Sequence, residues 1–154
     1  MKKIFFIISL VFLTSCATQT SFNDFYQDNQ KESDFSMGLN ASIVRTFLSD
    51  EDFEEVKPLL KKAKHVRILV FTEDTQKMTS KFNKFIKRSD FENLISIKDD
   101  DDKVKIYALE QKNSIKEIVL DINSGDEMVL LGLKTNLKEE DLHKLIEDND
   151  ITLN

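Results

Sequence analysis

The sequence contains few of the residues that usually build irregular functional loops. It has 3 glycines, 1 proline and 1 cysteine in 154 residues. Glycine-rich turns are needed for phosphate-binding loops and for nucleophile elbows, and neither a Walker loop nor a Gly-x-Ser-x-Gly motif occurs. A single cysteine also excludes a disulfide within the chain. The composition therefore gives little material for an active site of a familiar type.

Basic residues are too few for a second group of functions. Lysine and arginine number 22 against 28 aspartates and glutamates, and the net charge is −6. Binding to nucleic acid requires a basic surface that neutralises phosphates, and adhesion to anionic lipid requires basic clusters. We therefore expect no nucleic-acid partner and no electrostatic contact between the folded domain and a membrane.

The N-terminus has the pattern of a bacterial lipoprotein signal. Lys2 and Lys3 give a positive start, the apolar run Ile4–Leu13 follows, and a Leu-Thr-Ser-Cys lipobox ends at Cys16. An apolar run of this length suits a signal peptide and is too short to span a bilayer. We predict cleavage before Cys16 and attachment of lipid to its thiol. The alternative is an ordinary secretory signal with an accidental cysteine at this position.

This signal divides the chain into three parts. Residues 1–15 are the predicted signal peptide, residues 16–21 a lipidated tether, and residues 22–154 a single domain large enough to bury its own core. No apolar stretch after Cys16 approaches spanning length, so the membrane is reached through the lipid alone. Because no acidic residue directly follows Cys16, we expect the outer membrane rather than the inner membrane. Because no acidic cluster follows Cys16 closely, we expect the protein to face the periplasm rather than the cell surface.

Apolar residues three and four positions apart predict five helices. Phe91 and Leu94 are expected to close the end of the helix that contains Met78 and Phe82. Pro58 interrupts or restarts the helix that is capped at Ser49 or Asp50. The predicted helices carry Phe22, Phe25 and Tyr26; Leu39, Ile43, Val44, Phe47 and Leu48; the stretch from a cap at Ser49 or Asp50 to Lys64; Met78, Phe82, Phe85 and Ile86; and residues 139–148 with Leu142, Leu145 and Ile146 facing inward.

Period-two and β-branched patterns predict the strands. Val66–Thr72 is apolar on both faces, which is typical of a central strand. Four further strands are joined by short polar connectors and should form an antiparallel meander. These predicted strands are Leu94–Lys98, Lys103–Leu109, Ile115–Ile122 and Glu127–Leu133. The predicted fold class is α+β, with a mostly antiparallel sheet of about five strands and helices mainly on one face.

The sheet's other face is the predicted partner surface, or else the N-terminal helices cover it. We assign four apolar residues to it: Leu109, Val119, Val129 and Leu131.

Candidate ligand residues are sparse. The acidic run Asp99–Asp102 is expected to be a solvated turn, with cation binding as the alternative, because contiguous aspartates point in different directions and lack the glycine of a calcium loop. His65 and His143 fall in different elements and have no His, Cys or Glu at metal-ligand spacing. We assign no catalytic residue, no cofactor-binding residue and no metal ligand. The only predicted site residue is Cys16, for lipid.

An ordered set of features, none of them specific alone, resembles the DUF4252 family of Bacteroidetes lipoproteins over nearly the whole chain after the signal. The resemblance implies a periplasmic or outer-membrane setting and no particular reaction. Residues 134–137 depart from the Gly-Asn-Ile-Asp-like segment that often follows the last strand in the family. Behind the lipobox, the features are Phe22-Asn23-Asp24-Phe25-Tyr26, Phe47-Leu48, Val66–Leu69, Phe82 with Phe85, Leu94–Asp99, Lys103–Tyr107, Ile115–Leu120 and Met128–Leu133.

Three function classes follow from these patterns. The first is a non-enzymatic binding module, anchored to the membrane through Cys16, that contacts an envelope protein. The second is a regulatory component of an envelope signalling system, such as one with an extracytoplasmic sigma factor. The third is an enzyme with an unrecognised carboxylate site. The missing catalytic motifs favour the first class, with no cofactor.

Overall fold

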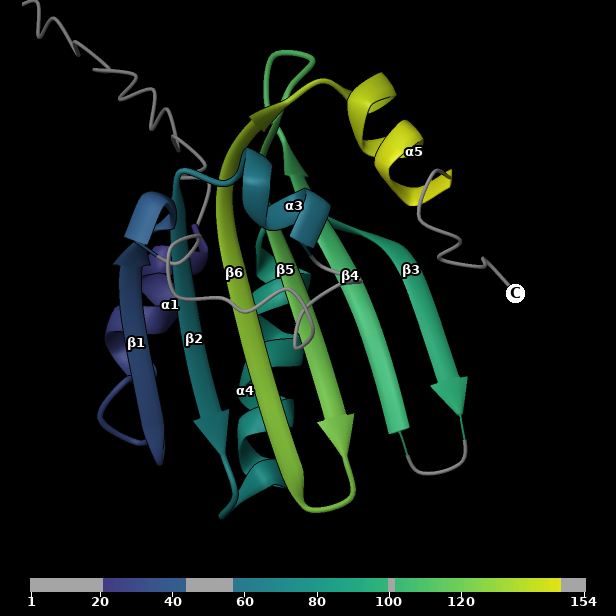
Figure 1. Ribbon diagram of the computed structural model, residues 1–154. Helices are drawn as coiled ribbons and strands as arrows, with labels where there is room; N and C mark the ends of the chain where they lie inside the picture. The colour runs from purple at the N-terminus through teal and green to yellow at the C-terminus, as the bar shows by residue number, and fades with distance from the viewer. Residues whose placement is uncertain (1–20, 44–56, 100–101, 148–154) are drawn as a thin grey trace, which may run out of the picture.

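The computed structural model describes residues 21–43, 57–99 and 102–147. They form one antiparallel sheet of six strands in the order β1-β2-β6-β5-β4-β3, with helices packed against it (Figure 1). The strands are β1 (Phe35–Asn40), β2 (His65–Phe71), β3 (Phe91–Asp99), β4 (Asp102–Glu110), β5 (Ile115–Ser124) and β6 (Glu127–Leu137). The helices are α1 (Phe22–Asn29), α3 (Lys57–Lys62), α4 (Thr75–Arg88) and α5 (Glu139–Glu147).

The α+β class and the mostly antiparallel sheet are confirmed. The strands β3 to β6 form the predicted meander, since each pairs antiparallel with the next. The predicted central strand is β2, which pairs with β1 on one side and β6 on the other. The sheet has one strand more than the expected five because the segment before Ala41 adds β1 at the edge.

The prediction of a helix at Leu39 is wrong. Leu39 lies in β1, where it pairs with Val66 of β2. Pairing with β2 satisfies the backbone of this segment and puts alternate side chains on the apolar face, which outweighs its helical spacing. Ile43 belongs to the helical residues 41–43 and is 44 % exposed. Residues 44–48 of this predicted helix lie outside the described residues. The same holds for Ser49 and Asp50, the predicted caps of the next helix.

Two strand boundaries also differ from the predicted ones. Phe91 and Leu94 do not close α4: both belong to β3, which contains the predicted strand Leu94–Lys98 and begins earlier, at Phe91. Buried Phe91 contacts Phe85 across 5.7 Å between ring centroids. At the other end of the sheet, β6 continues through residues 134–137 instead of turning. Thr135 explains this extension, because its hydroxyl donates to the carbonyl of Ile115 at 2.7 Å and keeps the two strands together.

Helices cover both faces of the sheet and not mainly one face as predicted, which gives two separate cores. The helices α1 and α4 lie on one face, while α3 and α5 lie on the other (Figure 1). The first face has an aromatic core in which Phe82 of α4 packs edge-on against Phe25 of α1 at 5.5 Å and against Tyr107 of β4 at 5.8 Å. The second face is aliphatic: its core is formed by residues such as Leu59, Leu60, Val66, Ile106, Ile118, Leu120, Leu133 and Leu142.

The predicted partner surface divides between these two faces. Leu109 and Val119 belong to the aromatic core beneath α1 and α4, whereas Leu131 belongs to the aliphatic core. Val129 pairs with Val70 in the register that places Leu131 opposite Ile68. Because side chains alternate along a strand, Val129 is on the aliphatic face with Leu131. The four residues therefore form no common surface.

The position of α1 depends on a glycine in β6. The Phe22 ring lies directly over Gly132, so that a Cβ atom at this position would overlap the ring. At the same end of the helix, the Phe22 backbone N–H donates to Glu117 Oε2 at 2.7 Å. The first residue of α1 is thus held by both a steric fit and a hydrogen bond to the sheet.

The substitution Gly132→Ala should displace Phe22 and destabilise the protein. Overpacking of a well-packed core costs about 1–3 kcal/mol, and urea denaturation of the purified protein measures the loss. The matched control is Gly38→Ala in β1, whose new Cβ would lie an ordinary 3.5 Å from the Tyr26 hydroxyl. Equal stability of the two variants would contradict this role of Gly132.

Candidate functional site

The residues singled out in the sequence are only partly placed by the structure. Cys16 lies outside the described residues, as do Asp100 and Asp101. Asp99 ends β3 and Asp102 begins β4, where the two are paired across the hairpin. Within the described ranges, no group of three or more His, Cys, Asp or Glu side chains is arranged to hold a metal ion.

The two histidines occupy separate parts of the fold. His65 begins β2, and His143 is on α5, with its Nε2 atom 3.8 Å from Glu139 Oε1. Both side chains are exposed. The structure therefore places no histidine beside a buried carboxyl group among the residues it describes.

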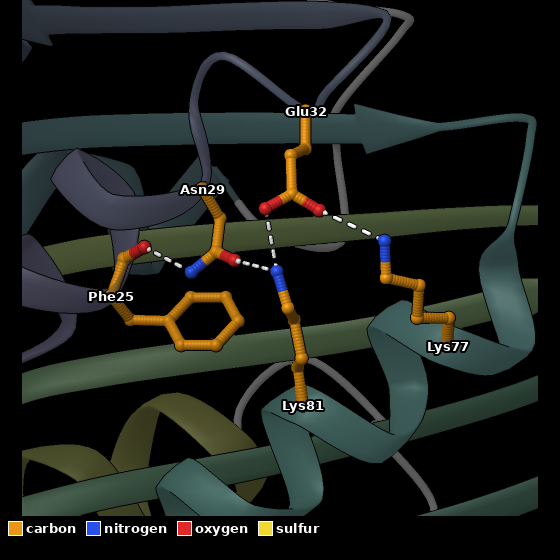
Figure 2. Close-up of polar contacts among 5 residues, drawn as sticks. All are labelled: Phe25, Asn29, Glu32, Lys77 and Lys81. Atoms are coloured by element: carbon orange, nitrogen blue, oxygen red, sulfur yellow. Dashed lines mark hydrogen bonds and ion pairs between the residues drawn. The ribbon is translucent and has the colours of Figure 1, made fainter.

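The polar cluster between α1 and α4 is a structural link. Lys81 lies 2.6 Å from Glu32 and 3.3 Å from Asn29, as Figure 2 shows. Lys77 contacts the other oxygen of Glu32 at 3.4 Å, and Asn29 donates to the Phe25 carbonyl at 2.7 Å. The hydrogen bond from Lys81 lowers the pKa of Glu32. These groups hold the end of α1 against α4.

Two carboxyl groups of β5 have raised pKa values: Asp121 is buried and Glu117 is half-buried. Asp121 of β5 is 2 % exposed and accepts a hydrogen bond from Asn123 at 2.7 Å. Burial raises the pKa of Asp121, and that of the neighbouring Tyr107. Burial also raises the pKa of Glu117, although the Phe22 N–H and nearby basic side chains act in the opposite direction. Both carboxyl groups have structural partners: Asp121 binds Asn123 of its own strand, and Glu117 binds the first residue of α1.

A pocket with an apolar floor lies where α5 passes beside β3 and β4. Its volume is about 140 Å³. This is close to the size of an internal cavity that holds one benzene-sized group. The floor is formed by Ile95, Ala108, Ile115 and Leu142, and the rim by Glu92, Leu94, Glu110, Glu139 and His143.

The rim of this pocket is acidic. Glu92, Glu110 and Glu139 come from three different elements and are all exposed. Among the described residues, no lysine or arginine forms an ion pair with any of them, and only Glu139 approaches a histidine. Apolar walls beneath exposed carboxylates that no described lysine or arginine contacts suit a group with an apolar body and a positively charged end.

The pocket adjoins the free edge of the sheet. β3 is the last strand in the sheet order and pairs only with β4 (Figure 1). The ladder shifts register between Asn93 and Ile95, which places Leu94 at a β-bulge. Leu94 is 40 % exposed and Ile97 is 38 % exposed. This edge therefore offers unpaired backbone groups and exposed apolar side chains beside the acidic pocket.

Sequence patterns did not indicate this pocket. Its lining comes from β3, β4, the start of β5 and α5, so no local spacing connects the residues. Glu92 and Glu110 are ordinary exposed acids in the sequence, and only the pairing of β3 with β4 brings them to one end of the sheet. Leu94 lies in the predicted strand Leu94–Lys98, but its position on the rim depends on tertiary contacts.

The fold and the pocket define a small α+β domain with helices on both faces of an open sheet and a side-chain-sized site at one edge. The chain belongs to the family described as "Domain of unknown function (DUF4252)", which matches residues 26–145. The matched segment includes the pocket and the β3 edge. Comparisons with curated proteins and with solved structures gave no significant match.

The buried carboxyl group of Asp121 makes stability depend on pH. Its pKa is raised on folding, so its stabilising contribution is complete below the unfolded value and is lost as pH rises through the folded value. Asp121→Asn keeps an acceptor for Asn123 without the charge. We expect this variant to gain stability over the wild type as pH rises from about 4 to 7, in urea denaturation.

The control for this prediction is Asp126→Asn, which removes the same charge from an exposed residue in the turn after β5. Its stability relative to the wild type should change less over this pH range. A stability difference between Asp121→Asn and the wild type that stays constant with pH would contradict the prediction.

Proposed function

We propose that the protein is a membrane-anchored envelope protein that acts as a non-enzymatic binding module. The observation that carries this proposal is the acid-rimmed apolar pocket beside the unpaired edge of β3. A pocket of this kind supports recognition, because its floor offers only apolar contact and its charges are exposed. The partner is an envelope protein, and no cofactor is required.

The position of the perturbed carboxyl groups supports a binding role over catalysis. Acid–base catalysis needs a titratable group with a tuned pKa within reach of substrate. The two carboxyl groups with raised pKa, Asp121 and Glu117, do not line the pocket. Glu117 instead binds the start of α1, and Asp121 is hydrogen-bonded to Asn123.

The anchor in this proposal is Cys16, which precedes α1 by a short tether. A lipid-modified cysteine holds a protein at the membrane, and no helix within the described ranges is long and apolar enough to cross one. Ser21 caps the start of α1, and its N–H donates a hydrogen bond to Asp24 Oδ2 at 3.1 Å. The proposed location is the periplasmic face of the outer membrane.

The anchor is tested by Cys16→Ser. Without the thiol that accepts lipid, the protein should lose labelling by a fatty-acid analogue and move from the membrane fraction to the soluble fraction. The control is the double variant Cys16→Ser with Ala17→Cys, which restores a thiol one residue outside the lipobox and should also stay unlabelled. Labelling of either variant would contradict lipidation at this motif.

The binding site is tested by photo-crosslinking in cells. A photoreactive amino acid in place of Leu94 should give a discrete adduct with one envelope protein, identified by mass spectrometry, because this side chain lies on the pocket rim. The control position is Ser80, an exposed residue of α4 on the opposite face. Adducts that are absent at Leu94, or identical at both positions, would contradict the proposed site.

A further inference from the structure

We propose that the partner adds an extended segment to the edge of β3 and inserts a lysine or arginine side chain into the adjoining pocket. This inference rests on the proposed binding function and names the chemistry of its partner. Two features carry it: the unpaired edge of a nine-residue strand, and a pocket whose size and charge fit one basic side chain.

The edge of β3 supplies the main-chain contacts. An exposed edge strand binds an extended peptide by continuing the ladder of backbone hydrogen bonds. β3 pairs with β4 on its inner side, and no described residue pairs with its outer side. Leu94 and Ile97 remain exposed and can pack against side chains of an added strand. Alternate residues of that strand would lie on the face that holds the pocket.

The pocket supplies selectivity for a positive charge. Its volume of about 140 Å³ suits the alkyl stem of one long side chain. Lysine and arginine bury such a stem on apolar surface while their charged ends stay at the rim. At this rim Glu92, Glu110 and Glu139 offer carboxylates that no described lysine or arginine neutralises. An acidic side chain would be repelled, and an uncharged one would leave Glu92 and Glu110 without a cationic partner among the described residues.

Charge also argues against a second copy of this chain as the occupant. The β3 strand of another copy would bring Glu92 and Asp99 against this rim and only Lys98 as a cation. The full chain has a net charge of −6. A second copy therefore adds negative charge to an acidic site, whereas a basic segment of another protein complements it.

The experiment measures binding of synthetic peptides to the purified full-length protein by fluorescence anisotropy. The probe is an acetylated, amidated, fluorescently labelled peptide that alternates threonine and valine around one central residue, which is lysine, arginine, norleucine or glutamate. We expect the lysine and arginine peptides to bind about tenfold more tightly than the glutamate peptide. Norleucine, which has an apolar stem without a charge, should bind with intermediate affinity.

Two protein variants locate the selectivity. The double variant Glu92→Gln with Glu110→Gln should reduce the preference for lysine over norleucine and leave norleucine binding nearly unchanged. The matched control is Asp126→Asn with Glu127→Gln, which removes two exposed charges where the turn after β5 enters β6. That control should retain the lysine preference.

Strand addition has its own test. Methylation of alternate backbone nitrogens on the peptide edge that faces β3 should abolish binding, whereas methylation on the opposite edge should leave it intact. Equal affinity for the lysine and glutamate peptides, or indifference to methylation on both edges, would overturn the inference. A dimer of the free protein in sedimentation that is lost in the variant Ser96→Pro would also overturn it.

The outcomes separate this inference from the proposed function. A partner crosslinked at Leu94, together with equal affinity for the lysine and glutamate peptides, would contradict the basic-segment inference and still support the binding function. If no adduct forms at Leu94 in cells, the binding function itself is contradicted, whatever affinities the peptides show.

Discussion

The structure depends on burial of both faces of the two innermost strands, β5 and β6. Along β5, Ile118, Val119 and Leu120 are consecutive and almost fully buried, with Ile118 and Leu120 on one face and Val119 on the other. A strand of this kind is stable only when helices or loops cover both sides of the sheet. The helices α1 and α4 therefore pack on the aromatic face, and α3 and α5 pack on the aliphatic face (Figure 1).

The contact between α1 and the sheet illustrates how closely the cover must fit. Phe22 lies on Gly132 because only a residue without a side chain lets a ring approach the backbone of β6. Glu117 binds the N–H of Phe22, and the cluster around Lys81 holds the other end of the helix on α4. Since α1 directly follows the tether, these contacts also connect the proposed lipid anchor to the folded domain.

The proposed binding site lies where the helices stop covering the aliphatic face of the sheet. α5 contacts the aliphatic face through Leu142, and beside it the acidic rim remains open. Open sheets leave edge strands that natural proteins protect with bulges or charges, and β3 has both a bulge at Leu94 and an acid at Glu92. These same features discourage pairing with an identical acidic strand and admit a strand that brings a positive charge.

Local pattern predicted much of the fold. The sequence by itself determined the meander from β3 to β6, the central position of β2 and the helical stripe of α4, because alternation and helical spacing are set by neighbouring residues. It also supplied the lipobox at Cys16, which stays a prediction. Only the tertiary structure decided that Leu39 lies in a strand, that Leu109 and Leu131 face opposite cores, and that Glu92, Glu110 and Glu139 surround one pocket. The physical reason is that strand pairing and helix docking join residues far apart in the chain, and no local period records which distant surface each residue meets.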